Sequence, residues 1–226
     1  MSKLTPKRLR CAVCTAWSEQ LVAESAESFE PPDFDTRPGK PSRSGIAYWV
    51  QACPDCGYCA NDISVSDEGV PEYVRHSIYR AFRNNKVFPE KATQFLCYAL
   101  VLEKSEQFAD AGWTALHAAW ICDDAKDIAN AASCRRRAIE LWKQAKAVGQ
   151  AFMDNDFEEF GLVADVHRRV EEWDEARAAA QGGLECEGIP QIVNALLRRE
   201  LAFVDRKDST AHNMAELRAA KPGGAR

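Results

Sequence analysis

Apolar residues recur every three or four positions from about residue 70 onward, which predicts a series of amphipathic helices. Two runs place large side chains at i, i+3, i+4 and i+7, and these are Trp113, Leu116, His117 and Trp120, then Phe160, Val163, Ala164 and His167. Further runs at 74–82, 95–102, 138–145 and 193–204 predict additional helices. Both histidines fall on apolar helix faces, so we expect them to pack rather than to bind a ligand.

Two of the predicted helix pairs repeat one arrangement of large and small residues. The pair at 163–184 combines large apolar residues with Ala176, Ala180 and Gly183, a pattern typical of tetratricopeptide-like repeats. It has Glu171 at the turn position where such repeats usually have glycine. In the preceding pair the region between the helices, 123–130, looks too long for this repeat. We expect residues 67–205 to form a stack of tetratricopeptide-like helical hairpins.

The first 66 residues have a different character. Residues 31–45 contain four prolines and two glycines, which excludes regular structure there. The β-branched and aromatic run at 46–51 predicts a strand that leads into a cysteine pair. Residues 206–226 are polar and predict a flexible tail, with a short helix near Met214. The expected fold is mainly α, with a small β module at 1–66, helices at 67–205 and a tail at 206–226.

Four cysteines in two CxxC pairs predict a metal site in the β module, so we expect residues 1–66 to form a zinc ribbon. Cys11 and Cys14 form one pair, Cys53 and Cys56 the other, and four thiolates are a donor set that tetrahedral Zn²⁺ prefers. A small module with few large apolar residues also needs such a stabilising element. Gly57 can take the positive φ that a turn needs just past the second pair.

Two further residues lie beside the cysteine pairs, and we make a separate prediction for each. Thr15 stands where Gly57 stands in the second pair, and a β-branched residue resists positive φ, so we expect the first turn to differ in shape. Cys59 forms a further CxxC with Cys56, but four sulfurs already complete the shell. We expect Cys59 to pack as a small side chain.

Composition and charge indicate in which compartment the protein works and which classes of partner it binds. The nine cysteines do not form a secreted disulfide pattern, and no signal peptide or membrane-length apolar run is present, which indicates the cytoplasm. A net charge of −5 argues against general binding of polyanions. The bases Lys3, Lys7, Arg8 and Arg10 precede the first cysteine pair; we favour a solvated segment over a phosphate-binding arm.

The remaining polar clusters have ordinary structural explanations. Asp33 and Asp35 fit turn chemistry better than acid–base catalysis, and Arg37 could pair with a carboxylate to hold this loop on the β module. The arginine clusters at 135–137, 168–169 and 198–199 are expected on solvated helix faces, although they could instead line a groove for an acidic peptide. No set of residues typical of catalysis stands out.

The chain resembles an uncharacterised bacterial family, domain of unknown function 2225. The residues that carry the resemblance are the pair Cys11–Cys14, the run from Trp49 to Ala60 around CPDCGYCA, the segment DFDTRP at 33–38, and the helix around Ala111–Trp113. The chain has Ala12, Thr15 and Cys59 where proline, glycine and a small apolar residue are usual. The resemblance implies metal binding and a helical scaffold, and it implies no reaction.

We consider three functions. The first is a zinc-binding, non-enzymatic adaptor or scaffold that binds a protein partner through the β module or a helical groove. The second is a nucleic-acid-binding regulator that uses the β module and the basic N-terminal arm. The third is a thiol redox switch at Cys53, Cys56 and Cys59.

Overall fold

The computed structural model describes residues 3–24 and 28–219. Its internal contacts divide the chain into two compact units. Unit 1 comprises Met1–Glu27 and Pro41–Phe152, and unit 2 comprises Ser28–Lys40 and Met153–Arg226. The segment 28–40 therefore contacts the C-terminal helices, although the sequence places it between the two cysteine pairs. Whether 1–66, 67–205 and 206–226 fold as separate domains stays a prediction.

Unit 1 begins with two short β-hairpins. Strands β1 (Leu4–Arg10) and β2 (Trp17–Ala23) pair antiparallel over their whole length. Strands β3 (Gln51–Ala52) and β4 (Cys59–Ala60) form a second antiparallel pair. The two hairpins are separate two-stranded sheets, and Gln20 of β2 reaches the second one by donating a hydrogen bond to the carbonyl of Ala52 at 3.1 Å.

The strand expected at 46–51 is mostly a 3₁₀-helix, η1 (Ser42–Tyr48), and only Gln51 of that run belongs to β3. The β-branched and aromatic composition misled the prediction because packing decides this segment. Ile46 within η1 and Val50 just after it are both buried. Trp49 packs edge-on against the His117 ring at 5.0 Å.

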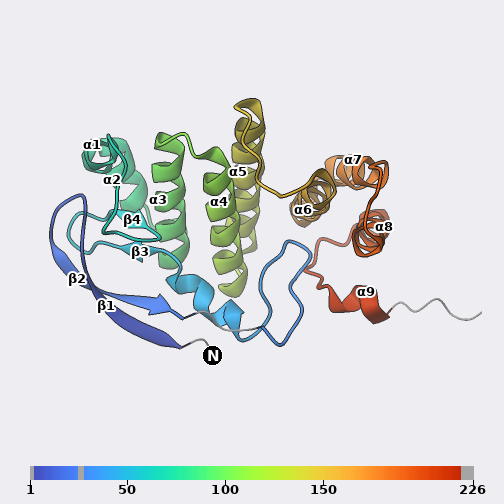
Figure 1. Cartoon of the computed structure of the whole chain (residues 1–226), viewed down its shortest axis with the longest axis horizontal. Coiled ribbons are helices and arrows are strands. Elements are labelled where there is room, and N and C mark those ends of the chain that lie inside the picture. The colour runs from blue at the N-terminus through green and yellow to red at the C-terminus, as the bar shows by residue number, and fades with distance from the viewer. Residues whose placement is uncertain (1–2, 25–27, 220–226) are drawn as a thin grey trace, which may run out of the picture. The chain divides into compact units, whose positions relative to one another are not determined.

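Five helices complete unit 1: α1 (Val70–Arg75), α2 (Ser77–Asn84), α3 (Glu90–Lys104), α4 (Phe108–Asp124) and α5 (Ile128–Ala147). Helices α3, α4 and α5 pack side by side (Figure 1). The single helix expected around Val74 and Phe82 is broken at His76, which has extended backbone and accepts a hydrogen bond from the Ile78 amide as an N-cap. Ile78 is accordingly exposed rather than part of an apolar stripe.

The same three-residue turn ends four helices, and three of these turns lead directly into the next helix. In each turn the middle residue has positive φ, at Glu106, Lys126, Glu171 and Lys207. The following amide donates to a carbonyl five residues earlier, as in Gln107 to Leu102 at 2.8 Å. This is the Schellman arrangement, with charged residues where glycine is usual. The connection between α4 and α5 is therefore only residues 125–127, so the expectation of an overlong region there was wrong.

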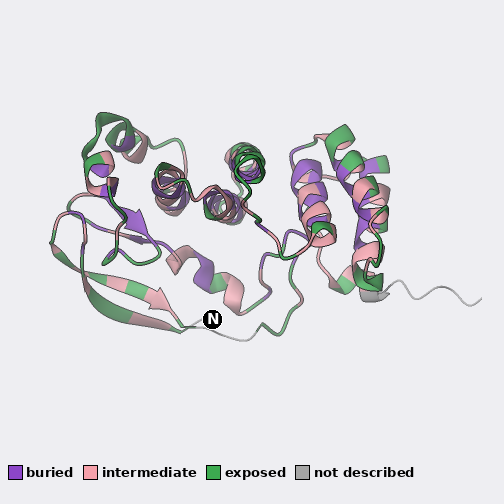
Figure 2. Cartoon of the chain, turned by 45° about the horizontal axis from the view of Figure 1, so that its top comes forward, coloured by how far each residue is buried: buried purple, intermediate pink, exposed green. Residues whose placement is uncertain are grey.

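Unit 2 contains α6 (Asp156–Arg169), α7 (Trp173–Leu184), α8 (Gln191–Asp205) and the short α9 (Ala215–Ala219). Its core joins Ala164, Ala180, Leu197 and Phe203 to Phe34 of the proline-rich segment. Gly183 lets α7 approach its neighbours closely, because a Cβ there would lie 2.8 Å from Leu197 Cδ1. In each unit the buried positions lie mainly on the helix sides that face other helices (Figure 2).

The fold is mainly helical with a small N-terminal β module, as the sequence predicts. The recurring turns are compatible with a hairpin stack, while the specific likeness to tetratricopeptide repeats stays a prediction. Within the described ranges, no helix combines the length and the apolarity that crossing a membrane requires.

Candidate metal centre

Each CxxC pair occupies the turn of one β-hairpin. The strand pairs end at Arg10↔Trp17 and at Ala52↔Cys59, which leaves two connecting turns at residues 11–16 and 53–58. We call these the first and the second knuckle. Both therefore have the same length and begin with the first cysteine of their pair.

The two knuckles also share one backbone conformation. The amide of Thr15 donates to the carbonyl of Cys11 at 2.8 Å, and that of Gly57 donates to the carbonyl of Cys53 at 2.9 Å. Thr15 has φ of 65° and Gly57 has φ of 78°. The expectation that Thr15 changes the first knuckle was wrong: the surrounding hydrogen bonds hold a β-branched residue in the left-handed region, at a cost of about 1–3 kcal/mol.

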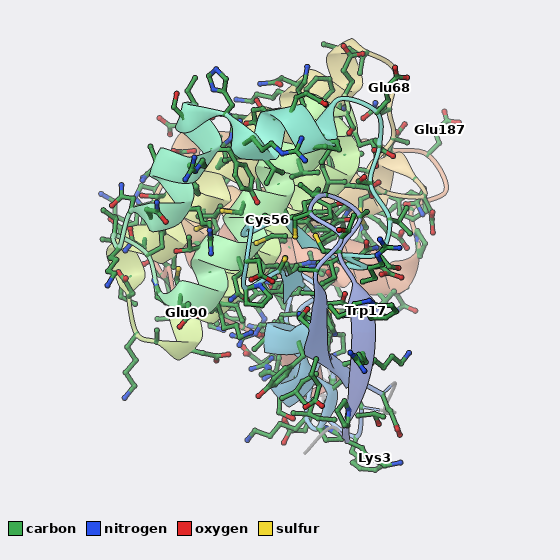
Figure 3. The ribbon with its side chains drawn as sticks, turned by 90° about the vertical axis from the view of Figure 1, so that its left-hand side faces the viewer. Lys3, Trp17, Cys56, Glu68, Glu90 and Glu187 are labelled. Atoms are coloured by element: carbon green, nitrogen blue, oxygen red, sulfur yellow. The ribbon has the colours of Figure 1, made fainter. Side chains whose placement is uncertain are left out.

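The four sulfurs of the two knuckles lie within 4.8 Å of one another. The sulfurs of Cys11 and Cys56 are 3.7 Å apart, and those of Cys14 and Cys53 are 3.5 Å apart. A tetrahedral ion with metal–sulfur bonds of ~2.3 Å places its ligands about 3.8 Å from each other. These thiols can thus hold one metal ion, and Figure 3 shows sulfur atoms gathered around Cys56.

Backbone amides of each knuckle point at its first sulfur. The sulfur of Cys11 accepts hydrogen bonds from the amides two and three residues further along, and the sulfur of Cys53 does the same. Burial raises the pKa of the Cys11 and Cys56 thiols. At Cys53 burial acts in the same direction, but the amide hydrogen bonds outweigh it and the pKa is lowered. A bound cation would favour all four thiolates.

Three arginines lie against the knuckle backbones. Arg10 donates to the carbonyl of Thr15 at 3.2 Å, and Arg75 donates to the carbonyl of Val13 at 3.0 Å. Arg83 packs on Gly57 so closely that a Cβ there would lie 2.1 Å from its Nε. Arg75 and Arg83 could not be found from the sequence, because they come from α1 and α2, outside both knuckles. Their charges would partly offset the net −2 of a divalent ion with four thiolates.

Cys59 lies outside the four-sulfur cluster, at the start of β4. It is 2% exposed, and its thiol donates to the carbonyl of Gly57 at 3.4 Å. It packs as a small buried side chain, as expected.

The segment with Asp33, Asp35 and Arg37 forms a tight turn, as its composition predicts. The amide of Asp33 donates to the carbonyl of Arg37, and the amide of Arg37 donates to Asp35 Oδ1 at 3.2 Å. All three residues are buried, which the sequence did not reveal. Within unit 2 the segment is held by Phe34, whose amide donates to the carbonyl of His212 at 3.0 Å.

The arginine clusters are less solvated than expected. Arg135 is buried and forms an ion pair with Asp123 at 2.5 Å, and Arg137 pairs with Glu103. Arg168 is buried in unit 2 between Asp165 and Glu200. These arginines are parts of helix packing, while the exposed Arg198 bonds within its own helix.

The two histidines on apolar faces pack as expected. His117 lies among aromatic rings, with the Trp120 ring centroid at 4.7 Å. His167 is buried, and its Nδ1 lies 2.7 Å from Glu172 Oε2. Neither joins the four-sulfur cluster.

A protein-family model described as "Uncharacterized protein conserved in bacteria (DUF2225)" matches residues 4–199. The chain belongs to this family. The match includes both knuckles and all helices from α1 to α7, and so extends further than the motifs alone indicated. Neither a curated protein nor a solved structure matches the chain.

Proposed function

We propose that the protein is a zinc-binding, non-enzymatic adaptor in the cytoplasm. Zn²⁺ would hold the two hairpins together, and the first hairpin would present a surface to a protein partner. The observation that carries the proposal is the pair of matching knuckles with four sulfurs at tetrahedral spacing. A closed shell of four thiolates is typical of structural zinc, because it leaves no position for a substrate.

The surroundings of the sulfurs favour a structural over a reactive site. Amide hydrogen bonds to Cys11 and Cys53, together with Arg10 and Arg75, disperse the thiolate charge. Less charge on sulfur makes it a weaker nucleophile toward oxidants. This argues against the redox switch at Cys53, Cys56 and Cys59 that the sequence left open.

The exposed face of the first hairpin supports a protein partner. Trp17 is 58% exposed and Leu21 is 45% exposed, and both lie on the face that also carries Arg8. The Arg8 guanidinium lies 5.4 Å from the Trp17 ring centroid, so it stacks on this side chain and limits its freedom. Tryptophan and arginine are the residues that most often dominate binding energy at protein interfaces.

The nucleic-acid alternative has one supporting observation, the basic residues of β1. Several of these bases are engaged within the hairpin. Lys3 pairs with Glu24 at 3.2 Å, Glu19 faces Arg8 across the strands, and Arg10 bonds Thr15. Few free charges therefore remain for phosphates. A low-salt mobility-shift experiment with single- and double-stranded probes tests this alternative, and salt-sensitive binding would favour it over the adaptor.

The metal is tested by elemental analysis of the protein purified without added metal. We expect one zinc per chain, and loss of it in Cys53→Ser, with Cys186→Ser as the matched control because Cys186 lies in unit 2. Four thiolates also bind iron, so finding iron instead of zinc would change the identity of the metal but support the same site. An absence of bound metal in the wild-type protein would refute the site.

The partner surface is tested by quantitative crosslinking in native extract. A Trp17→Ser, Leu21→Ser protein should lose a specific partner that wild type retains. The control is Ile128→Ser, which removes an even more exposed apolar side chain, 72% exposed, from α5. Equal recovery of every partner by the hairpin variant and the control would refute the role of this face.

A further inference from the structure

Unit 1 contains a cavity of about 920 Å³ beside the second knuckle. Its lining residues come from the knuckle at 52–54, from the end of α2 and the loop after it at 83–88, and from the first turns of α3. In Figure 3, Cys56 marks the second knuckle and Glu90 marks the start of α3. Small-molecule sites in proteins have volumes of ~300–1,000 Å³, so the cavity is large enough for a small organic ligand.

The Arg83 side chain is held in place at the wall of this cavity. Tyr79 and Arg83 are four residues apart and therefore lie on the same face of α2. The hydroxyl of the buried Tyr79 donates to the Gly57 carbonyl at 3.0 Å, which fixes this face of α2 on the knuckle. The Arg83 guanidinium then lies directly over Gly57, where any Cβ would clash with it. Helix and knuckle together position the guanidinium.

Arg83 and Lys86 place two positive charges on the cavity wall, and Glu90 is the one carboxylate among the lining residues. Within the described ranges, neither cation has an ion pair or a side-chain hydrogen bond. The buried Arg135 and Arg168, by contrast, both face carboxylates. A metal ion with four thiolates would add negative charge near Arg83, so we expect an anion in the cavity to need both cations.

The cavity wall also offers hydrogen-bond donors and an apolar side chain. The carbonyl oxygen of the Gln94 side chain accepts a hydrogen bond from Lys91 Nζ at 3.0 Å, which leaves the Gln94 amide hydrogens available to a ligand. Asn84 and Asn85 add two further side-chain amides at the end of α2, and both residues are exposed, so the cavity is open to solvent. Phe88 gives the wall an aromatic ring.

We propose that this cavity binds a small organic phosphate monoester, with the phosphate on Arg83 and Lys86 and the organic part against Phe88. A phosphate monoester carries a charge of about −1.5 to −2 and three terminal oxygens, so it matches two cations and several amides better than a carboxylate does. A guanidinium binds two phosphate oxygens at once, and an ammonium adds a point charge. The inference goes beyond the proposed adaptor role and does not depend on it.

The test is an NMR titration of the full-length, metal-loaded protein with phenyl phosphate, compared with inorganic phosphate, benzoate and phenol. We expect phenyl phosphate to bind most tightly and to shift the amide signals of residues 83–94, inorganic phosphate to bind more weakly, and phenol not to bind. No shifts with phenyl phosphate at about 10 mM would overturn the proposal. Equal binding of phenol would remove the role of the anion, and tighter binding of benzoate would replace phosphate by a carboxylate.

Variants locate the bound phosphate. Arg83→Met should raise the Kd for phenyl phosphate roughly tenfold, and Lys86→Met should raise it roughly threefold because the exposed ammonium is screened by solvent. The matched control is Arg80→Met, which removes an exposed arginine of α2 outside the cavity and should leave the Kd unchanged. An unchanged Kd in Lys86→Met would overturn the proposal even if Arg83→Met fails to fold. Equal weakening in Arg80→Met would show general attraction of anions and would also overturn it.

Discussion

The buried cluster around Arg168 in unit 2 makes a sharp prediction about pH. Arg168 donates to Asp165 Oδ1 at 2.5 Å and to Glu200 Oε2 at 2.6 Å, and also to the carbonyls of Asp208 and Thr210. All three side chains are nearly inaccessible to solvent. One cation cannot balance two buried carboxylates. Burial, with the nearby charge of Asp165, raises the pKa of Glu200 to about 8.

A proton on Glu200 explains the contacts of the cluster. Asp165 Oδ2 and Glu200 Oε1 are buried and receive no hydrogen bond, and a proton on Glu200 would let the two carboxyl groups share one, which two ionised carboxylates cannot do. A neutral Glu200 leaves Arg168 paired with one carboxylate, so the cluster has no net charge. We therefore expect Glu200→Gln to preserve it, because the amide has the same shape, can accept from Arg168 and can donate to Asp165.

The sign of the pH dependence follows from the raised pKa. An unfolded glutamate has a pKa of 4.5, so between pH 4.5 and about 8 folding takes up a proton. The contribution of this group to the free energy of unfolding is complete below pH 4.5. It is lost as pH rises toward 8, by at most ~1.4 kcal/mol per pH unit. Glu200→Gln should remove this slope, stay within about 1 kcal/mol of wild type at pH 5, and exceed it at pH 8.

Urea unfolding followed by circular dichroism from pH 5 to 9 measures the effect. Hydrogen exchange of peptides from α6 and α8 assigns it to unit 2. Glu187→Gln is the matched control, because Glu187 is an exposed glutamate of the same unit (Figure 3). If Glu200 is instead ionised, the glutamine variant breaks a buried ion pair and loses about 3 kcal/mol at pH 7. Such a loss, together with a wild-type free energy of unfolding that does not change between pH 5 and 9, would refute the proposed protonation of Glu200.

Four further predictions concern backbone conformation and the metal. Thr15→Gly should raise the free energy of unfolding of the metal-loaded protein by about 1 kcal/mol in urea titrations, because glycine accepts positive φ without strain; equal or lower stability would contradict it. Gly57→Ala should lower it by about 3 kcal/mol, since a Cβ there meets Arg83. Lys126→Gly should raise the free energy of unfolding by ~0.5–1 kcal/mol, because Lys126 also has positive φ. The control is Lys143→Gly, which lies inside α5 and should lower the free energy of unfolding. Chelation of the metal should increase hydrogen exchange in β1–β4 and leave α6–α8 protected, and uniform exchange changes would show that the metal supports the whole chain.

The metal centre could be predicted from sequence because its signal is local. Two CxxC pairs determine four donors without knowledge of the fold, and the structure brings Cys11, Cys14, Cys53 and Cys56 together. The helices were predictable for a similar reason, since a period of 3.6 residues is visible within each segment. The conformation of Thr15 was not predictable, because a hydrogen-bonded turn overrides the residue's own preference.

The contacts that could not be predicted from the sequence are mainly those between segments far apart in the chain. The loop with Asp33 and Arg37 lies between the cysteine pairs in sequence, and nothing local indicates that it joins the C-terminal helices. Arg168 looked like a solvated residue in a basic cluster, because its two carboxylate partners and the carbonyls it binds come from three separate segments. The prediction of a strand at 46–51 was wrong because packing overrides the strand preference of β-branched and aromatic residues there.

The nine cysteines can now be sorted by what surrounds each sulfur. The four clustered sulfurs face amides and arginines, which would stabilise thiolates bound to a cation. Cys59 and Cys97 are buried where β4 packs on α3, and Cys122 and Cys134 are buried on α4 and α5. Cys186 bonds the Gly182 carbonyl of its own helical turn. Reactivity toward a small oxidant should follow access and charge rather than spacing in sequence.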